Sequence, residues 1–126
     1  YVGNKFNKIA MNPPFGTSGK TAMEHVEKAC KHLHWTGGTL IAIVPNGPSM
    51  QKRLDLFFNT QHRYRLTGEI ILPQCTFERA GTSVNCKIIR IQDGYYQGNY
   101  EHYNHIDLSY IKDQKAFFET LENLEF

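Results

Sequence analysis

Five of the six residues in Thr39–Val44 (TLIAIV) are apolar, and this run constrains the fold more than any other part of the chain. An uninterrupted apolar run of this length is typical of a strand covered on both faces, because a strand with one face in water alternates apolar and polar residues. Two glycines precede the run and Pro45–Pro48 (PNGP) follows it, so turns bound the strand. We therefore expect a central strand of an α/β sheet here.

Strand and helix patterns alternate on both sides of this run. Before it, Phe6–Met11 reads as a short strand that ends in a loop, and Lys20–His34 carries apolar residues at helical spacing. After it, a second helix and two further strands are expected, at 49–58, Glu69–Leu72 and Val84–Ile91.

This alternation predicts an open, partial Rossmann-like α/β sheet with flanking helices. Only the eleven residues Pro73–Ser83, without a helical pattern, join the last two strands, and a parallel crossover usually needs a helix in such a gap. We therefore expect three parallel strands and one antiparallel strand. Because ligands bind beyond the carboxyl ends of strands in these sheets, Asn12–Phe15 and Pro45–Pro48 are expected on one functional rim.

The end of the chain, residues 93–126, is expected to form a separate region from residues 1–92. It opens with a Tyr-rich stretch and ends in an expected helix within Lys112–Leu124. The tyrosines are expected to pack a hairpin or loop against the core, and the alternative, stacking on nucleobases, stays open. Residues 52–90 carry seven Lys/Arg against three Asp/Glu, which permits a polyanion as partner without requiring one.

Composition limits the kinds of protein and of site that this chain can form. No apolar run approaches the length of a membrane span, so no membrane partner is expected. Three widely separated cysteines, Cys30, Cys75 and Cys86, argue against a disulfide framework and for a reducing compartment such as the cytoplasm. The cluster CKHLH lacks a second ligand pair at zinc-site spacing, so no metal site is expected. The start at Tyr1, without an initiator methionine, leads us to expect a segment of a longer protein.

The stretch NPPFGTSGKT, residues 12–21, allows two interpretations. Its tail is similar to a phosphate-binding loop, G-x-x-x-x-G-K-[ST], whose first glycine would have to fall at position 14. That position is Pro14, which has no amide N–H for a phosphate and cannot adopt the conformations that glycine allows. Spacing therefore argues against nucleotide hydrolysis, which would predict tight ATP binding.

The other interpretation rests on a resemblance that covers roughly residues 5–92. FNKIAMNPPFG resembles the catalytic strand and loop of the S-adenosylmethionine-dependent amino-methyltransferases. MEHVEKACKHLHWTGGTLIAIVPNG is similar to the next helix and strand of that family, and GEIILPQCTFERAGTSVNCKIIRI to its closing strands. The three blocks, in this order, most resemble the catalytic half of DNA adenine-N6 methyltransferases of the restriction-modification type, which implies a prokaryotic cell.

The resemblance implies roles for the loop. Asn12 would accept one proton of the target amine through its side-chain oxygen, and Pro13 would accept the other through its main-chain carbonyl. These acceptors favour the pyramidal, more nucleophilic amine. Pro14 would stiffen the turn, and Phe15 would stack on the extracted base, with Phe77 on its other side. Candidates for contacts to DNA phosphates are Lys20, Arg53, Arg63, Arg65 and Arg79.

The same resemblance implies that S-adenosylmethionine is the cofactor of the full-length enzyme. The glycine-rich cofactor loop of the family belongs to strands that would precede this segment, so only Asn12 and Pro14 are candidates for cofactor contacts here. We therefore expect the chain to be inactive alone, with weak or no cofactor binding. Its expected partners are DNA, the missing N-terminal half, and a second copy through an exposed sheet edge.

Two other functions remain open at this point. Loops of this type also serve methyltransferases of guanine N2 in RNA and of glutamine in release factors, because each of those substrates is a planar amine or amide. A non-catalytic nucleic-acid-binding module is the second alternative, and it predicts that Asn12 is dispensable.

Overall fold

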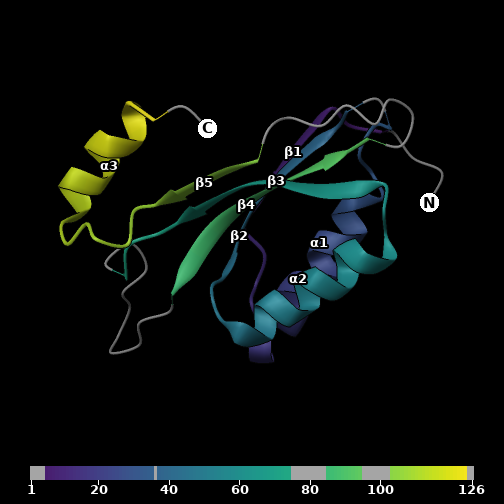
Figure 1. The fold of residues 1–126 in the computed structure, drawn as a ribbon, viewed down its shortest axis with the longest axis horizontal. Helices are drawn as coiled ribbons and strands as arrows, with labels where there is room; N and C mark the ends of the chain where they lie inside the picture. Colours follow the sequence, from purple (N-terminus) through teal and green to yellow (C-terminus); the bar gives the residue numbers. More distant parts are fainter. Residues whose placement is uncertain (1–4, 36, 75–84, 95–102, 125–126) are drawn as a thin grey trace.

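The computed structural model describes residues 5–35, 37–74, 85–94 and 103–124. A five-stranded sheet in the order β1-β2-β4-β3-β5 forms its centre (Figure 1). The strands are β1 (Lys8–Met11), β2 (Thr39–Pro45), β3 (Tyr64–Ile71), β4 (Cys86–Asp93) and β5 (Asn104–Asp107).

Four of these strands run in one direction. β1 pairs with β2 in parallel, β5 pairs with β3 in parallel, and β4 lies between β2 and β3, antiparallel to both. The expected α/β fold and the antiparallel direction of the fourth strand are thus confirmed. β5 adds a parallel strand in the stretch where the sequence pattern predicts a hairpin or loop.

The bounds of the first helix and of the third strand differ from the expected ones. The first helix, α1 (Lys20–Cys30), is shorter than the expected Lys20–His34, because the backbone of His32 and His34 bonds to Phe6 instead of continuing the helix. β3 begins well before the expected Glu69. Its first residues, Tyr64–Gly68, do not form a continuous apolar run, and their pairing with β4, which includes a bulge between Leu66 and Gly68, extends the strand.

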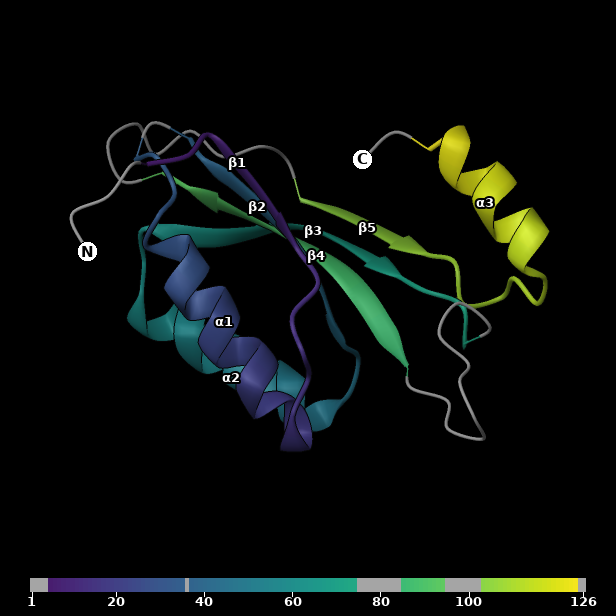
Figure 2. The same cartoon turned by 180° about the vertical axis from the view of Figure 1, so that it is seen from behind.

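The helices divide between the two faces of the sheet. α1 and α2 (Pro48–Thr60) lie side by side against one face, and α3 (Gln114–Glu122) lies at the β5 end of the sheet (Figures 1 and 2). The core under α1 and α2 contains Leu54, Ile89 and Ile91, whereas the second core contains Phe117 of α3 with Ile70. Because successive residues of a strand point to opposite faces, the two cores occupy opposite sides of the sheet.

Polar groups inside the sheet are paired. Asp93, which is fully buried, accepts a hydrogen bond at 2.6 Å from Nη2 of Arg63. Arg90 donates from Nη2 to the carbonyl of Thr67 at 2.7 Å and from Nε to its hydroxyl at 2.9 Å. Such pairing avoids the large cost of burying an isolated charge. No helix in the described part of the chain is long and apolar enough to cross a membrane.

Candidate functional site

The loops after β1 and β2 lie at the same edge of the sheet, because these neighbouring strands are parallel. Together they line a cleft of about 430 Å³. Phe15 and Gly16 come from the first loop, and Pro45–Met50 come from the second loop and the start of α2; Ser18, Gly19 and Asn85 complete the lining. Of the expected rim, the structure brings Phe15 and Pro45–Pro48 together in the cleft, whereas Asn12, Pro13 and Pro14 are not among the described residues that line it.

Two glycines allow the first loop to fold back onto α1. Gly16 has φ 70° and Gly19 has φ 75°, in the left-handed region that favours glycine. A Cβ atom on Gly16 would lie 2.2 Å from Oγ1 of Thr21, and one on Gly19 would lie 2.8 Å from Sδ of Met50. The main-chain N–H of Ala22 donates to the carbonyl of Phe15 at 3.2 Å, which ties the loop to the helix. The loop thus has a defined path beside α2.

Asn12 and Pro13 present the two acceptors that the resemblance implies. Asn12 is exposed, whereas Pro13 is buried and holds the turn against the protein. Within the described residues, neither the Asn12 amide nor the Pro13 carbonyl forms a hydrogen bond to another part of the chain. The exposed Asn12 side chain is therefore free to bind a ligand at this edge of the sheet.

Phe15 connects the loop to the rest of the molecule. Its half-buried side chain packs against both hydrophobic cores and also lines the cleft. One part of the ring therefore anchors the loop, and another part faces the space where a planar ligand could stack. Pro14, which precedes it, is exposed.

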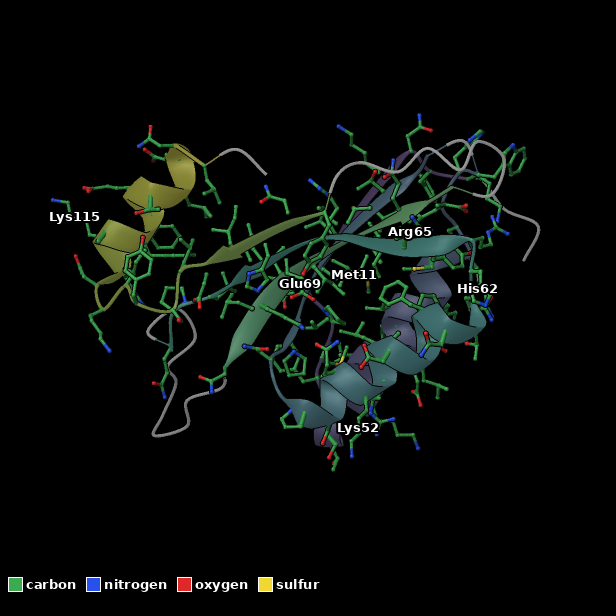
Figure 3. All side chains as sticks on the ribbon, viewed as in Figure 1. Met11, Lys52, His62, Arg65, Glu69 and Lys115 are labelled. Carbon is green, nitrogen blue, oxygen red and sulfur yellow. The ribbon has the colours of Figure 1, made fainter. Side chains whose placement is uncertain are left out.

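The candidate phosphate contacts separate into two groups. Lys20 is exposed at the first turn of α1, and Arg53 donates from Nε to the carbonyl of Ser18 at 3.0 Å, so both flank the first loop. Arg63 and Arg65 lie at the amino end of β3, which is the edge of the sheet opposite to the rim because β3 runs parallel to β1. Figure 3 shows Arg65 far from Lys52, which neighbours Arg53 in α2.

The guanidinium of Arg63 is also engaged by the buried Asp93 carboxylate. Of the four candidates that the structure describes, Lys20 and Arg53 are therefore the two that lie beside the first loop. Phe77, Arg79 and Cys75 lie outside the described residues.

A second hollow, of about 460 Å³, adjoins the cleft and was not expected from the sequence. It lies at the carboxyl ends of β3 and β5, and its polar lining includes Gln74, His105 and Asp107. Asn46 and Asn85 line both hollows. His105 and Asp107 are two residues apart, so they lie on the same face if their segment is a strand. This spacing could have indicated the hollow only if it had been known that β5 joins the sheet.

The two described cysteines do not resemble reactive or metal-binding thiols. Burial raises the pKa of Cys30 to about 12 and that of Cys86 to about 11, because the thiolate would lose its hydration. Both are buried, free thiols. Among the described residues, His, Cys, Asp and Glu form no cluster of three that could hold a metal ion.

Solved structures share this fold. A Listeria monocytogenes protein assigned to the class I S-adenosylmethionine-dependent methyltransferases superposes with a TM-score of 0.65 at 14% identity, over 98% of this chain and 43% of its own. The modification protein of the type I restriction enzyme EcoKI superposes with a TM-score of 0.60 at 20% identity, over 83% of this chain and 26% of its own. A Vibrio vulnificus protein assigned as the modification subunit of a type I restriction enzyme superposes with a TM-score of 0.61 at 17% identity, over 94% of this chain and 31% of its own.

These identities establish a likeness of fold. The chain therefore has an α/β fold of the kind found in S-adenosylmethionine-dependent methyltransferases. It spans less than half the length of each of these three proteins. No family model and no curated protein matches the sequence.

Proposed function

We propose that this chain is the catalytic part of a longer enzyme that transfers a methyl group from S-adenosylmethionine to the N6 amine of adenine in DNA. The observation that supports the proposal is the Asn12-Pro13 turn, which directly follows β1 and leads into Phe15 at the cleft. Within the described residues, neither the Asn12 amide nor the Pro13 carbonyl forms a hydrogen bond to another part of the chain. The fold that the chain shares with methyltransferases, among them modification proteins of type I restriction enzymes, supports the same function.

The turn can activate an aromatic amine by accepting hydrogen bonds from its N–H groups. The nitrogen lone pair of such an amine is delocalised into the ring, which makes the nitrogen a poor nucleophile. Hydrogen bonds from the two N–H groups to the Asn12 side-chain oxygen and the Pro13 carbonyl oppose that delocalisation, and the preformed turn needs little reorganisation. Phe15 would hold the ring by stacking, while Lys20 and Arg53 contact neighbouring phosphates.

The cleft fits only part of the cofactor. No acidic side chain occurs among the described residues that line it, and an acidic side chain is the usual partner of ribose hydroxyl groups in folds of this kind. Asn12 and Pro14 would contact S-adenosylmethionine near its reactive end, and the bound cofactor supplies the methyl group. We expect most of the cofactor site to lie on the part of the enzyme that this chain lacks.

β1 is the surface to which that missing part would attach. It forms one edge of the sheet, with backbone groups available for another strand. A hollow of about 420 Å³ follows β1 and is lined by Ile9 and Ala29 together with Phe6, which is 48% exposed. The N-terminal half would cover this surface, and in the isolated chain a second copy could pair there instead.

The test is Asn12→Ala in the longer protein, measured as transfer of labelled methyl groups to DNA, RNA and release factor. We expect DNA to be the substrate, and the variant to lose about 100-fold or more in kcat, the typical cost of removing one preorganised polar group. Asn59→Ala, which removes an exposed asparagine from α2, is the matched control and should keep full activity.

Full activity of Asn12→Ala would overturn the proposal and would favour a binding module. Calorimetric titration of the isolated chain with S-adenosylmethionine addresses the missing half separately. We expect no binding in the micromolar range, and tight binding would contradict the division of the cofactor site.

A further inference from the structure

The second hollow continues the cleft along the edge of the sheet. Asn46 and Asn85 separate the two spaces, and the main-chain N–H of Asn46 donates to the carbonyl of Asn85 at 2.7 Å. Phe15 borders the first space, near β1 and β2, and Asp107 borders the second, at the end of β5. Because neighbouring strands lie about 4.8 Å apart, a strand of nucleic acid with one base beside Phe15 could reach the second hollow with a nearby nucleotide.

The chemistry of this hollow suits the edge of a base and does not suit a phosphate. Among the described residues that line it, Asp107 is the only carboxylate and no Lys or Arg occurs, so these residues would repel an anion. The side chains of Asn46 and Asn85 each carry both a donor and an acceptor. This combination matches the pattern of donors and acceptors on base edges, where carboxylates accept from exocyclic amines.

Asp107 is kept in its acceptor form. One of its oxygens, Oδ1, accepts from the main-chain N–H of Ser109 at 2.9 Å. The hydrogen bonds from Ser109 lower the pKa of the Asp107 carboxyl. A carboxylate has more acceptor positions than this single neighbour uses, so Asp107 can still accept from a ligand.

A buried polar chain supports the neighbouring His105. Nζ of Lys87 lies 3.4 Å from Oε1 of Glu69 and donates to Oε1 of Gln51 at 2.9 Å, which ties β3 and β4 to α2. Oε2 of Glu69 lies 3.9 Å from Nε2 of His105, and burial together with the Glu69 carboxylate raises the pKa of Tyr103. Figure 3 shows Glu69 near the middle of the sheet. His105 thus has a positioned carboxylate on the side of the sheet and an accessible ring on the side of the hollow.

We propose that this hollow binds the edge of a base near the methylated one, and that Asp107 and the amides of Asn46 and Asn85 select a base with an exocyclic amine, adenine or cytosine, over thymine. The inference rests on the proposed function, since it places a second nucleotide beside the catalytic cleft. It adds a sequence preference that is built into the catalytic chain itself.

The test measures binding of fluorescently labelled, single-stranded oligo-dC and oligo-dT to this chain by anisotropy. Oligo-dC is compared with oligo-dT because neither contains adenine, the proposed occupant of the cleft beside Phe15. We expect oligo-dC to bind roughly tenfold more tightly, the discrimination typical of one good contact to a base edge. Asp107→Asn should reduce this ratio to about twofold or less while the thermal unfolding midpoint stays unchanged, because the asparagine keeps an oxygen for the Ser109 N–H.

Glu119→Gln is the matched control. It also removes one negative charge, from an exposed position on α3, and should strengthen binding of both oligonucleotides slightly without changing their ratio. Equal binding of oligo-dC and oligo-dT by the unaltered chain, no binding of either, or an unchanged ratio in Asp107→Asn would each overturn the inference.

The two proposals fail in different ways. Methylation that depends on Asn12, without a base preference that depends on Asp107, would overturn the second hollow alone. A base preference that depends on Asp107, without methylation that depends on Asn12, would keep the binding site and overturn the proposed reaction.

Discussion

The two ends of the sheet differ in how their faces are covered. At the β1 and β2 end, α1 and α2 cover one face, and the strands point Leu40 and Val44 into a continuous apolar core. At the β3 and β5 end, the same face carries Glu69, Lys87 and His105, and the apolar residues point to the other side, where α3 packs (Figures 1 and 2).

The two ends of the sheet therefore differ in what they contribute: the first contributes most of the apolar core, and the second offers polar side chains to a ligand. Among the described residues, the core under α1 and α2 contains fourteen buried residues, and the core under α3 contains six. The larger core holds the loops of the rim in place. The smaller one supports a polar surface on which Tyr103 is 54% exposed and stacks on His105 with ring centroids 6.5 Å apart. The same sheet therefore anchors the proposed catalytic loop at one end and offers polar side chains to a ligand at the other.

The largest expected difference between the two ends is in the cost of a core truncation. Leu54→Ala, in the larger core, should lower the free energy of unfolding by about 3 kcal/mol, and Leu108→Ala, in the smaller core, by about 2 kcal/mol. The first cavity is enclosed by two helices and the sheet and cannot collapse easily. Urea unfolding monitored by circular dichroism measures both, and a larger loss for Leu108→Ala would reverse the assignment of the main core.

Alkaline pH should destabilise the protein through its buried thiols. Burial raises the pKa of Cys30 from an ordinary value of 9.0 to about 12, so the folded state binds this proton more tightly than the unfolded state. The resulting stabilisation is complete below pH 9 and is lost as the pH rises toward 12. At pH 10.5 the loss amounts to about 2 kcal/mol.

The unfolding free energy of Cys30→Ala and of the unaltered protein, measured at pH 8 and at pH 10.5, gives this contribution. The variant should lose less stability between the two pH values than the unaltered protein. Cys86→Ala serves as the comparison from the other core, and its effect should be similar, because the pKa of Cys86 is raised to about 11 and therefore also lies above pH 10.5. An identical pH dependence in Cys30→Ala and in the unaltered protein would show that this thiol does not ionise on unfolding.

The smallest expected effect concerns the helix cap at the β5 end. The Asp113 side chain accepts from the main-chain N–H groups of Lys115 and Ala116 at 3.3 Å, whereas α1 and α2 begin after Gly19 and Gly47 without a side-chain cap. Asp113→Ala should cost about 1 kcal/mol. Hydrogen exchange should show faster exchange in α3 and unchanged exchange in α1 and α2. Faster exchange in all three helices would mean that the two ends unfold together.

Much of the larger end could be predicted from the sequence. The apolar run Thr39–Val44 and the helical spacing in Lys20–His34 led to β2 and α1, because apolar residues that repeat with the period of an element show how that element is covered. The rim followed from the parallel direction of β1 and β2. The second hollow did not follow, because β5 is short and only its pairing with β3 brings His105 and Asp107 next to Asn46 and Asn85.

Local sequence thus determined most of the elements, the antiparallel direction of β4 and the composition of the Asn-Pro-Pro-Phe loop, since these depend on patterns that span a few neighbouring residues. It did not determine β5. Tertiary structure alone decided which side chains meet. It separated Arg63 and Arg65 from the rim, brought Arg53 to the loop, and joined the ends of β2, β3 and β5 into one polar edge. The physical reason is that contacts between distant residues depend on strand order and register, and on which face of the sheet each helix covers.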